Sequence, residues 1–234
     1  GVRGFLENYG IPNMQMEVTY VSGTDLQELE EAIRPNTDLI VLESPATFVF
    51  TVVDFEKIAE IANRHHIKTY TDNSYCTPLY QKPLDYGITF VMHTMSKYIG
   101  GHSDVIGGIL VSKDGALMDK VKNQIRALTG GIIGPMEAWL SIRGLRTLEA
   151  RLVQHQENAK KVAAFLEGHE KVLRVMYTGL DSHPQKALIE KQQCGHTGLM
   201  SFVVRGGEAA AVKLVNGLKV FKIGCSWGGF ESLA

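Results

Sequence analysis

The first half of the chain alternates between short apolar runs and longer segments whose apolar residues recur at helical spacing. Five segments carry the pattern of strands: 18–22, 38–42, 67–71, 88–93 and 105–111. The segment 38–42 is a nearly continuous apolar run, which is typical of a strand that is covered on both faces. Strands that alternate with helices predict an α/β fold, in which a mostly parallel sheet is flanked by helices.

Two segments between these runs carry helix signals. In 24–34, Thr24 and Gln27 form a capping-box pattern, and Pro35 ends the segment. A second helix follows Asp54, whose side chain can cap the first turn. We expect its apolar stripe to face the sheet; that stripe consists of Phe55, Ile58, Ala59, Ile61 and Ala62.

The second half changes character, because helical periodicity runs almost unbroken from 135 to about 170. Gly144 interrupts it, and since glycine costs about 1 kcal/mol relative to alanine in a helix, we expect a boundary or kink there. A strand at 199–204, a helix at 208–218 and a strand at 220–223 follow. We therefore predict a large domain over 1–143 and the beginning of a smaller α+β domain over 144–234.

Composition narrows the classes of function. Lys plus Arg is 24 and Asp plus Glu is 25, so the formal charge of −1 gives no general attraction to nucleic acid or anionic membrane. No apolar run approaches the roughly 20 residues of a membrane-spanning helix, and residues 1–10 show no secretory signal. Cys76, Cys194 and Cys225 are odd in number and lack zinc-site spacing, so we expect no disulfide framework, no metal and a cytoplasmic location.

Ligands of α/β proteins bind at the carboxyl ends of parallel strands, and two of the predicted strands end in unusual residues. The strand at 67–71 is followed by Asp72, whose carboxylate needs a partner or water because burying a lone charge is expensive. Two interpretations of Asp72 are open at this point, a cap for the next turn and a functional acid.

The strand at 88–93 leads into Thr94, Ser96 and Lys97, with a glycine pair following. Hydroxyls and backbone N–H groups in an irregular turn can hold a phosphate dianion, and a desolvated lysine can form a Schiff base with an aldehyde. A lysine after a strand is also commonly a solvated charge, and hydroxyls before glycines commonly mark a turn. Pyridoxal phosphate (PLP) needs both elements, together with a carboxylate that keeps its pyridine nitrogen protonated.

The lysine block makes the chain resemble a known family. The segment 96–104, Ser-Lys-Tyr-Ile-Gly-Gly-His-Ser-Asp, with Asp72, Asn73 and Pro78 before it, is similar to the transsulfuration (Cys/Met metabolism) family of PLP enzymes. The likeness extends through 43–45, 141–148 and 228–233 and so covers nearly the whole chain. It implies the aspartate-aminotransferase-like fold of PLP enzymes (fold type I) and PLP as the cofactor.

The resemblance implies roles for individual residues. Lys97 carries the Schiff base and later acts as the base that moves protons. Asp72 pairs with the pyridinium nitrogen, and Thr94 and Ser96 bind the phosphate. Thr47 stands where the family usually has an asparagine near the cofactor's phenolic oxygen, and its hydroxyl can still donate one hydrogen bond.

The same family contains β-lyases, γ-lyases and γ-synthases. Ser226 and Trp227, followed by two glycines, resemble the bacterial cystathionine β-lyases, in which this segment lines the substrate-carboxylate site, and the hydroxyl of Thr47 is a further likeness. The resemblance therefore favours β-elimination of cystathionine to homocysteine, pyruvate and ammonia. A methionine or cystathionine γ-lyase or a γ-synthase is the alternative, and a non-catalytic binding or assembly module is the alternative of another class. An alternative interpretation of Trp227 is that it is an ordinary aromatic residue of the core.

The resemblance also implies features that lie outside these residues. A ring-stacking tyrosine and a glycine turn for the phosphate belong before Gly1, and an arginine for the substrate α-carboxylate belongs after Ala234. We therefore expect the chain to be truncated at both ends. We also expect a homotetramer whose active sites are shared between subunits and whose substrate is a small sulfur amino acid.

Overall fold

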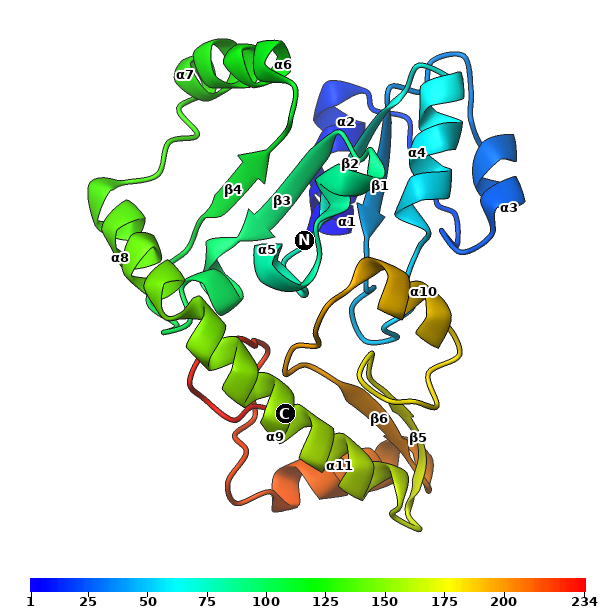
Figure 1. Ribbon diagram of the computed structural model, residues 1–234, viewed down its shortest axis with the longest axis vertical. Helices are drawn as coiled ribbons and strands as arrows, with labels where there is room; N and C mark the ends of the chain where they lie inside the picture. The colour runs from blue at the N-terminus through cyan, green and yellow to red at the C-terminus, as the bar shows by residue number, and fades with distance from the viewer. The chain divides into compact units, whose positions relative to one another are not determined.

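The computed structural model describes all of residues 1–234 and divides into two units, 1–37 and 38–234, which are described separately (Figure 1). In the first unit, α1 (Val2–Phe5), the π-helical turn η1 (Leu6–Gly10) and α2 (Ile11–Met14) follow one another. The strand predicted at 18–22 is wrong, because these residues form no strand. An extended segment needs a neighbouring strand to pair its backbone, and this unit contains none.

The helix predicted over 24–34 is shorter than expected. It is α3 (Leu26–Glu31), and its N-cap is Asp25 rather than Thr24. The Asp25 carboxylate accepts hydrogen bonds from the backbone N–H groups of Gln27 at 2.9 Å and Glu28 at 3.1 Å. A carboxylate at this position satisfies two otherwise unpaired donors and also suits the positive end of the helix dipole.

The second unit is built on a four-stranded sheet in the order β1-β2-β3-β4. These strands are β1 (Leu39–Glu43), β2 (Lys68–Asp72), β3 (Phe90–Thr94) and β4 (Gly108–Val111). The first three are parallel, and β4 is antiparallel to β3. The predicted mostly parallel sheet with flanking helices is therefore confirmed.

The helix between β1 and β2 matches its prediction closely. It is α4 (Phe55–Arg64), and Asp54 caps it by accepting a hydrogen bond from the Lys57 N–H at 3.2 Å. All five residues of the predicted apolar stripe are buried. α4 packs against β2 and against the short 3-10 helix η2 (Pro83–Tyr86), which follows α5 (Thr77–Tyr80).

The chain after β3 forms further helical segments before the long helices. The π-helical turn η3 (Met95–Ile99) directly follows β3 and contains Lys97. After β4 come α6 (Gly115–Lys120), the π-helical η4 (Val121–Arg126) and α7 (Ala127–Thr129). No helix in the structure is both long and apolar enough to cross a bilayer.

The long helical segment is interrupted close to the predicted position. It consists of α8 (Pro135–Arg146) and α9 (Leu148–Glu167), and the break falls at Thr147 rather than at Gly144. Gly144 has a different role: a Cβ atom there would lie 2.2 Å from the Ile99 carbonyl oxygen. The glycine therefore allows α8 to lie directly on the turn after Lys97. The domain boundary at 143/144 stays a prediction, and in the structure it lies inside α8.

The C-terminal part contains a small antiparallel pair of strands, β5 (Val172–Met176) and β6 (Ser201–Val204). Between them lies α10 (Lys186–Gln192), and α11 (Gly207–Gly217) follows β6, where the sequence predicted a helix. α9 packs against β5 (Figure 1). The strand predicted at 220–223 is wrong, because the only pairing there is an isolated bridge between Lys222 and Leu233.

Candidate active site

The candidate site lies at the carboxyl ends of the first two strands. In-register pairing of β1 with β2 places Glu43 directly opposite Asp72, each the last residue of its strand. Both line one small cavity together with residues from β3 and from distant parts of the chain. The complete lining is Glu43, Thr47, Asp72, Ser74, Tyr75, Thr94, Leu199 and Trp227. Three of the predicted cofactor residues and one predicted substrate residue therefore meet at this edge of the sheet.

Asp72 caps the turn after β2, and its role as a functional acid stays a prediction. Its Oδ1 accepts a hydrogen bond from the Ser74 N–H at 2.9 Å, so the carboxylate does cap the following turn. It also lines the cavity, where it can pair with a protonated ring nitrogen. Ser74 in turn accepts a hydrogen bond from the Thr94 N–H at 2.8 Å, which ties the end of β2 to the end of β3.

Thr94 begins the turn that carries the lysine. Its Oγ1 accepts a long hydrogen bond from the Ser96 N–H at 3.4 Å and donates to the Gly107 carbonyl at 3.3 Å. Thr94 lines the cavity, whereas Ser96 does not. The two predicted phosphate-binding residues therefore lie two positions apart at the start of the turn, but only Thr94 lines the space beside Asp72.

Lys97 lies half-buried, and its ammonium group has a hydroxyl and an aromatic ring as its neighbours. Nζ donates a hydrogen bond to Ser226 Oγ at 2.9 Å and lies 4.0 Å from the centre of the Trp227 ring. Burial lowers the pKa of the Lys97 ammonium, and nearby Cys225 partly opposes this effect. A lysine that loses its proton more easily is a better nucleophile toward an aldehyde and a better proton acceptor.

Gly228 allows the C-terminal segment to lie close against the lysine turn. Gly228 has a φ of +80°, and a Cβ atom there would lie 2.6 Å from the Tyr98 nitrogen and 2.9 Å from the Lys97 carbonyl carbon. Tyr98 is buried against Leu148 and Leu152 of α9. The backbone on either side of Lys97 is thus fixed by α8, α9 and the 226–229 segment together.

Sequence reasoning missed several residues of this arrangement. Glu43, Ser74 and Tyr75 line the cavity, but the sequence singled out none of them as a site residue. The strand register was the available signal for Glu43, because it ends a strand next to the one that ends at Asp72. Cys76, in contrast, is buried at 1% exposure and is packed with Phe50 and Tyr75, as expected for a small apolar residue.

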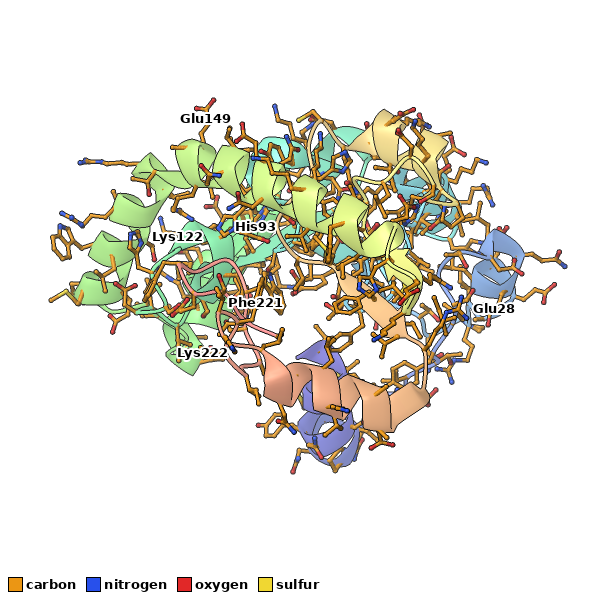
Figure 2. The ribbon with its side chains drawn as sticks, turned by 90° about the horizontal axis from the view of Figure 1, so that it is seen from below. Glu28, His93, Lys122, Glu149, Phe221 and Lys222 are labelled. Atoms are coloured by element: carbon orange, nitrogen blue, oxygen red, sulfur yellow. The ribbon has the colours of Figure 1, made fainter.

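The two histidines near the lysine have their own surroundings. His93 in β3 is 5% exposed and lies in the interior, whereas Glu149 of α9 points outward (Figure 2). Burial lowers the pKa of His93, and Asp72 opposes the change. His102 contacts the Gly100 carbonyl through Nδ1 at 2.8 Å. His102 therefore supports the end of the lysine turn, whereas His93 is an interior residue of β3.

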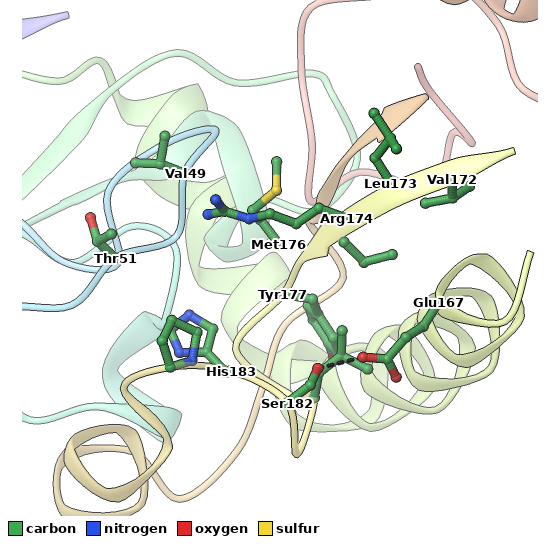
Figure 3. Close-up of a pocket in the computed structure, with 13 residues that line it drawn as sticks. Val49, Thr51, Glu167, Val172, Leu173, Arg174, Met176, Tyr177, Ser182 and His183 are labelled. Carbon is green, nitrogen blue, oxygen red and sulfur yellow. Dashed lines mark hydrogen bonds between the residues drawn. The ribbon is translucent and has the colours of Figure 1, made fainter. Parts of the chain in front are cut away.

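A larger cavity lies elsewhere, beside β5 (Figure 3). Its volume is about 440 Å³, against about 60 Å³ for the cavity beside Asp72. Its lining includes Val49, Arg174, Tyr177 and His183 but none of the predicted site residues. We place the chemistry at the smaller cavity, because reactive groups from separate strands and loops meet there.

The residues at the smaller cavity fit PLP by their chemistry. The carboxylate of Asp72 and the hydroxyl of Thr94 line the cavity. The amine of Lys97, whose pKa burial lowers, and the hydroxyl of Ser96 do not line it and lie in the turn that follows Thr94. Trp227 Nε1 is buried and has no hydrogen-bond partner in the protein. An unpaired buried donor is costly, so a bound acceptor would stabilise this indole.

The fold and this set of residues define a PLP-dependent enzyme. The family model described as Cys/Met metabolism PLP-dependent enzyme matches residues 4–234, and the chain belongs to this family. L-methionine gamma-lyase of Fusobacterium nucleatum subsp. nucleatum is 37% identical over 97% of the chain and 58% of its own length. Cystathionine gamma-lyase of Bacillus subtilis is 38% identical over 93% of the chain and 57% of its own length.

The solved structures agree with the family assignment. Cystathionine gamma synthase from Xanthomonas oryzae pv. oryzae, in complex with aminoacrylate and cysteine, superposes with a TM-score of 0.92. It is 39% identical over 97% of the chain and 59% of the solved chain. The predicted family, fold type and cofactor are thus confirmed. The chain spans somewhat under three fifths of the length of these relatives, whose names specify γ rather than β chemistry.

Proposed function

We propose that this protein uses PLP to break or form a carbon–sulfur bond at Cγ of a sulfur amino acid, as a γ-lyase or γ-synthase. The relatives named for γ chemistry support this reading and lead us to prefer it over the β-elimination that the sequence favoured. The observation that carries the chemistry is the position of Lys97, whose Nζ contacts Ser226 and Trp227 beside the cavity that Asp72 lines.

Bound PLP would withdraw electrons from Cα of an attached amino acid and so make its proton acidic. The Lys97 amine, whose pKa is lowered by burial, is the group that takes up this proton and returns it. Ser226 accepts a hydrogen bond from Nζ and so orients the amine. Asp72 would hold the ring nitrogen in its protonated form, and Thr94 and Ser96 would bind the phosphate. Trp227 covers Lys97 and excludes water from this side.

β-Elimination is the second candidate, and one observation favours it. Ser226 and Trp227, which resemble the cystathionine β-lyases, are the two residues that contact the Lys97 ammonium. A segment that touches the proton-transferring group can influence which carbon loses its substituent. We therefore keep the β-lyase as the alternative of the same family.

The products of cystathionine cleavage distinguish the two reactions. γ-Elimination by the holoprotein yields 2-oxobutyrate and cysteine, whereas β-elimination yields pyruvate and homocysteine, and mass spectrometry separates these products. We expect 2-oxobutyrate, with no product from Lys97→Ala. Pyruvate as the main product would reverse our preference, and equal turnover by Lys97→Ala would exclude the mechanism.

We further propose that the protein is a homotetramer of the cytoplasm with sites shared between subunits. Large apolar side chains are exposed on and near α8, as an interface between subunits would require: Ile132, Ile133, Met136, Trp139, Ile142 and Leu145. Sedimentation equilibrium should give four times the subunit mass. A monomer at micromolar concentration would contradict this proposal.

A further inference from the structure

Glu43 is a second carboxylate in the candidate site, and none of the roles described above involves it. Glu43 lies opposite Asp72 in the β1–β2 register, and both residues line the same cavity. The two acids differ in their contacts. Asp72 accepts from the Ser74 backbone, whereas Glu43 accepts only from Thr47 among the hydrogen bonds of the structure.

Thr47 directs both of its hydrogen-bond donors at one atom. Its backbone N–H donates to Glu43 Oε1 at 3.0 Å, and its hydroxyl donates to the same oxygen. A threonine hydroxyl has one O–H and two lone pairs. With the O–H directed at Glu43, the hydroxyl offers only acceptor lone pairs to anything bound in the cavity. This differs from the sequence-based expectation that Thr47 donates a hydrogen bond to the cofactor.

We infer that Glu43 is a positioning residue that turns Thr47 into a hydrogen-bond acceptor, so that this edge of the site favours the protonated form of the bound cofactor. The inference rests on the proposed PLP site. An acceptor with a carboxylate behind it stabilises a neighbouring N–H or O–H group, whereas a donor at the same place would stabilise the deprotonated form. Glu43 acts both through Thr47 and through its own negative charge.

The test is a spectrophotometric pH titration of the holoprotein, because the absorbance of bound PLP changes when its chromophore loses a proton. We expect Glu43→Ala to lower the pH midpoint of this change by about one unit or more, a tenfold loss of proton affinity. Glu43→Gln keeps the acceptor and loses the charge, so its midpoint should fall between those of wild type and Glu43→Ala. Glu60→Ala, an exposed acid of α4, is the matched control and should titrate like wild type.

A double-mutant cycle tests whether Glu43 acts through Thr47. Thr47→Val should lower the midpoint by itself and should add less than its full effect in the Glu43→Ala background, since contacting residues couple. An unchanged midpoint in Glu43→Ala, or fully additive shifts in the double variant, would overturn the inference. Absence of a Lys97-dependent absorbance band in wild type would instead overturn the proposed function, and this inference with it.

Discussion

At the scale of single residues, Lys97 differs in its surroundings from two lysines that form ion pairs, Lys186 and Lys191. Lys186 and Lys191 pair with carboxylates, and hydrogen bonds to Asp181 and Glu56 respectively raise their pKa values. Lys97 has a hydroxyl and an indole ring as neighbours instead, and burial lowers its pKa. An ion pair with an acid stabilises the charged form of a lysine, whereas burial makes the Lys97 ammonium lose its proton more easily.

Replacing Asp72 separates attachment of the cofactor from its activation. Asp72→Ala should leave Lys97 able to capture PLP but should slow exchange of the substrate Cα proton by about 10- to 100-fold, the effect of losing one charge-assisted hydrogen bond. Proton NMR in deuterated water measures this exchange. Wild-type exchange by the loaded variant would contradict the role of Asp72.

His196 gives the protein a predicted sensitivity to acid. Burial, assisted by the nearby Lys160, lowers the pKa of His196 to about 4 from an ordinary 6.5. In the folded state His196 therefore resists protonation. The contribution of neutral His196 to the free energy of unfolding is complete above pH 6.5 and is lost as the pH falls toward 4. Urea unfolding should show a smaller loss of stability over this range in His196→Asn. Identical slopes in the two proteins would exclude this role.

The sequence allowed part of the site to be predicted at this scale. Asp72 and Lys97 could be proposed because their residue types match one cofactor, and Thr47 and Trp227 could be proposed through the resemblance. Glu43 was not proposed, because its position opposite Asp72 depends on which strands pair and in which register, and the structure shows this pairing.

At the scale of elements, the contact between α8 and the lysine turn depends on one glycine. A Cβ atom on Gly144 would lie 2.2 Å from the Ile99 carbonyl oxygen and 2.5 Å from the Gly100 carbonyl oxygen. Backbone atoms cannot move aside as flexible side chains do, so the helix or the turn must shift. Arg151 of α9 donates a hydrogen bond to the Gly144 carbonyl at 2.8 Å and so joins α9 to α8 at the same glycine.

Gly144→Ala should therefore destabilise the protein by about 1–3 kcal/mol and should weaken PLP capture by Lys97. Gly115→Ala in α6 is the matched control, because no heavy atom lies within 4 Å of the added Cβ. The control should be neutral, or stabilising by up to about 1 kcal/mol. Denaturant unfolding checks both variants, and equal stabilities would show that α8 tolerates the displacement.

Elements could be predicted where local pattern and burial agree. α4 matched in its cap and its buried face because Asp54 and the apolar stripe are local signals. The wrong strands at 18–22 and 220–223 have apolar character but lack a neighbouring strand, which no local pattern reveals. β5 was missed, and it pairs only with β6, which lies far along the chain.

At the scale of the whole second unit, the site is built by segments distant in sequence. Residues 226–229 lie on the turn at 97–98, and α8 and α9 support that turn from behind. Binding at Lys97 should thus depend on the intact unit rather than on the lysine loop alone. The α/β class could be predicted from the alternation of strands and helices. The contact of residues 226–229 with the lysine turn could not, because it depends on how distant segments pack together.

The central claim is that the amine of Lys97 holds PLP. The holoprotein can be reduced with borohydride and digested, and the peptide that carries the pyridoxyl group can be mapped by mass spectrometry. We expect the label on Lys97 and none in Lys97→Ala. A label on another lysine of the wild-type protein, or equal labelling of Lys97→Ala, would contradict it.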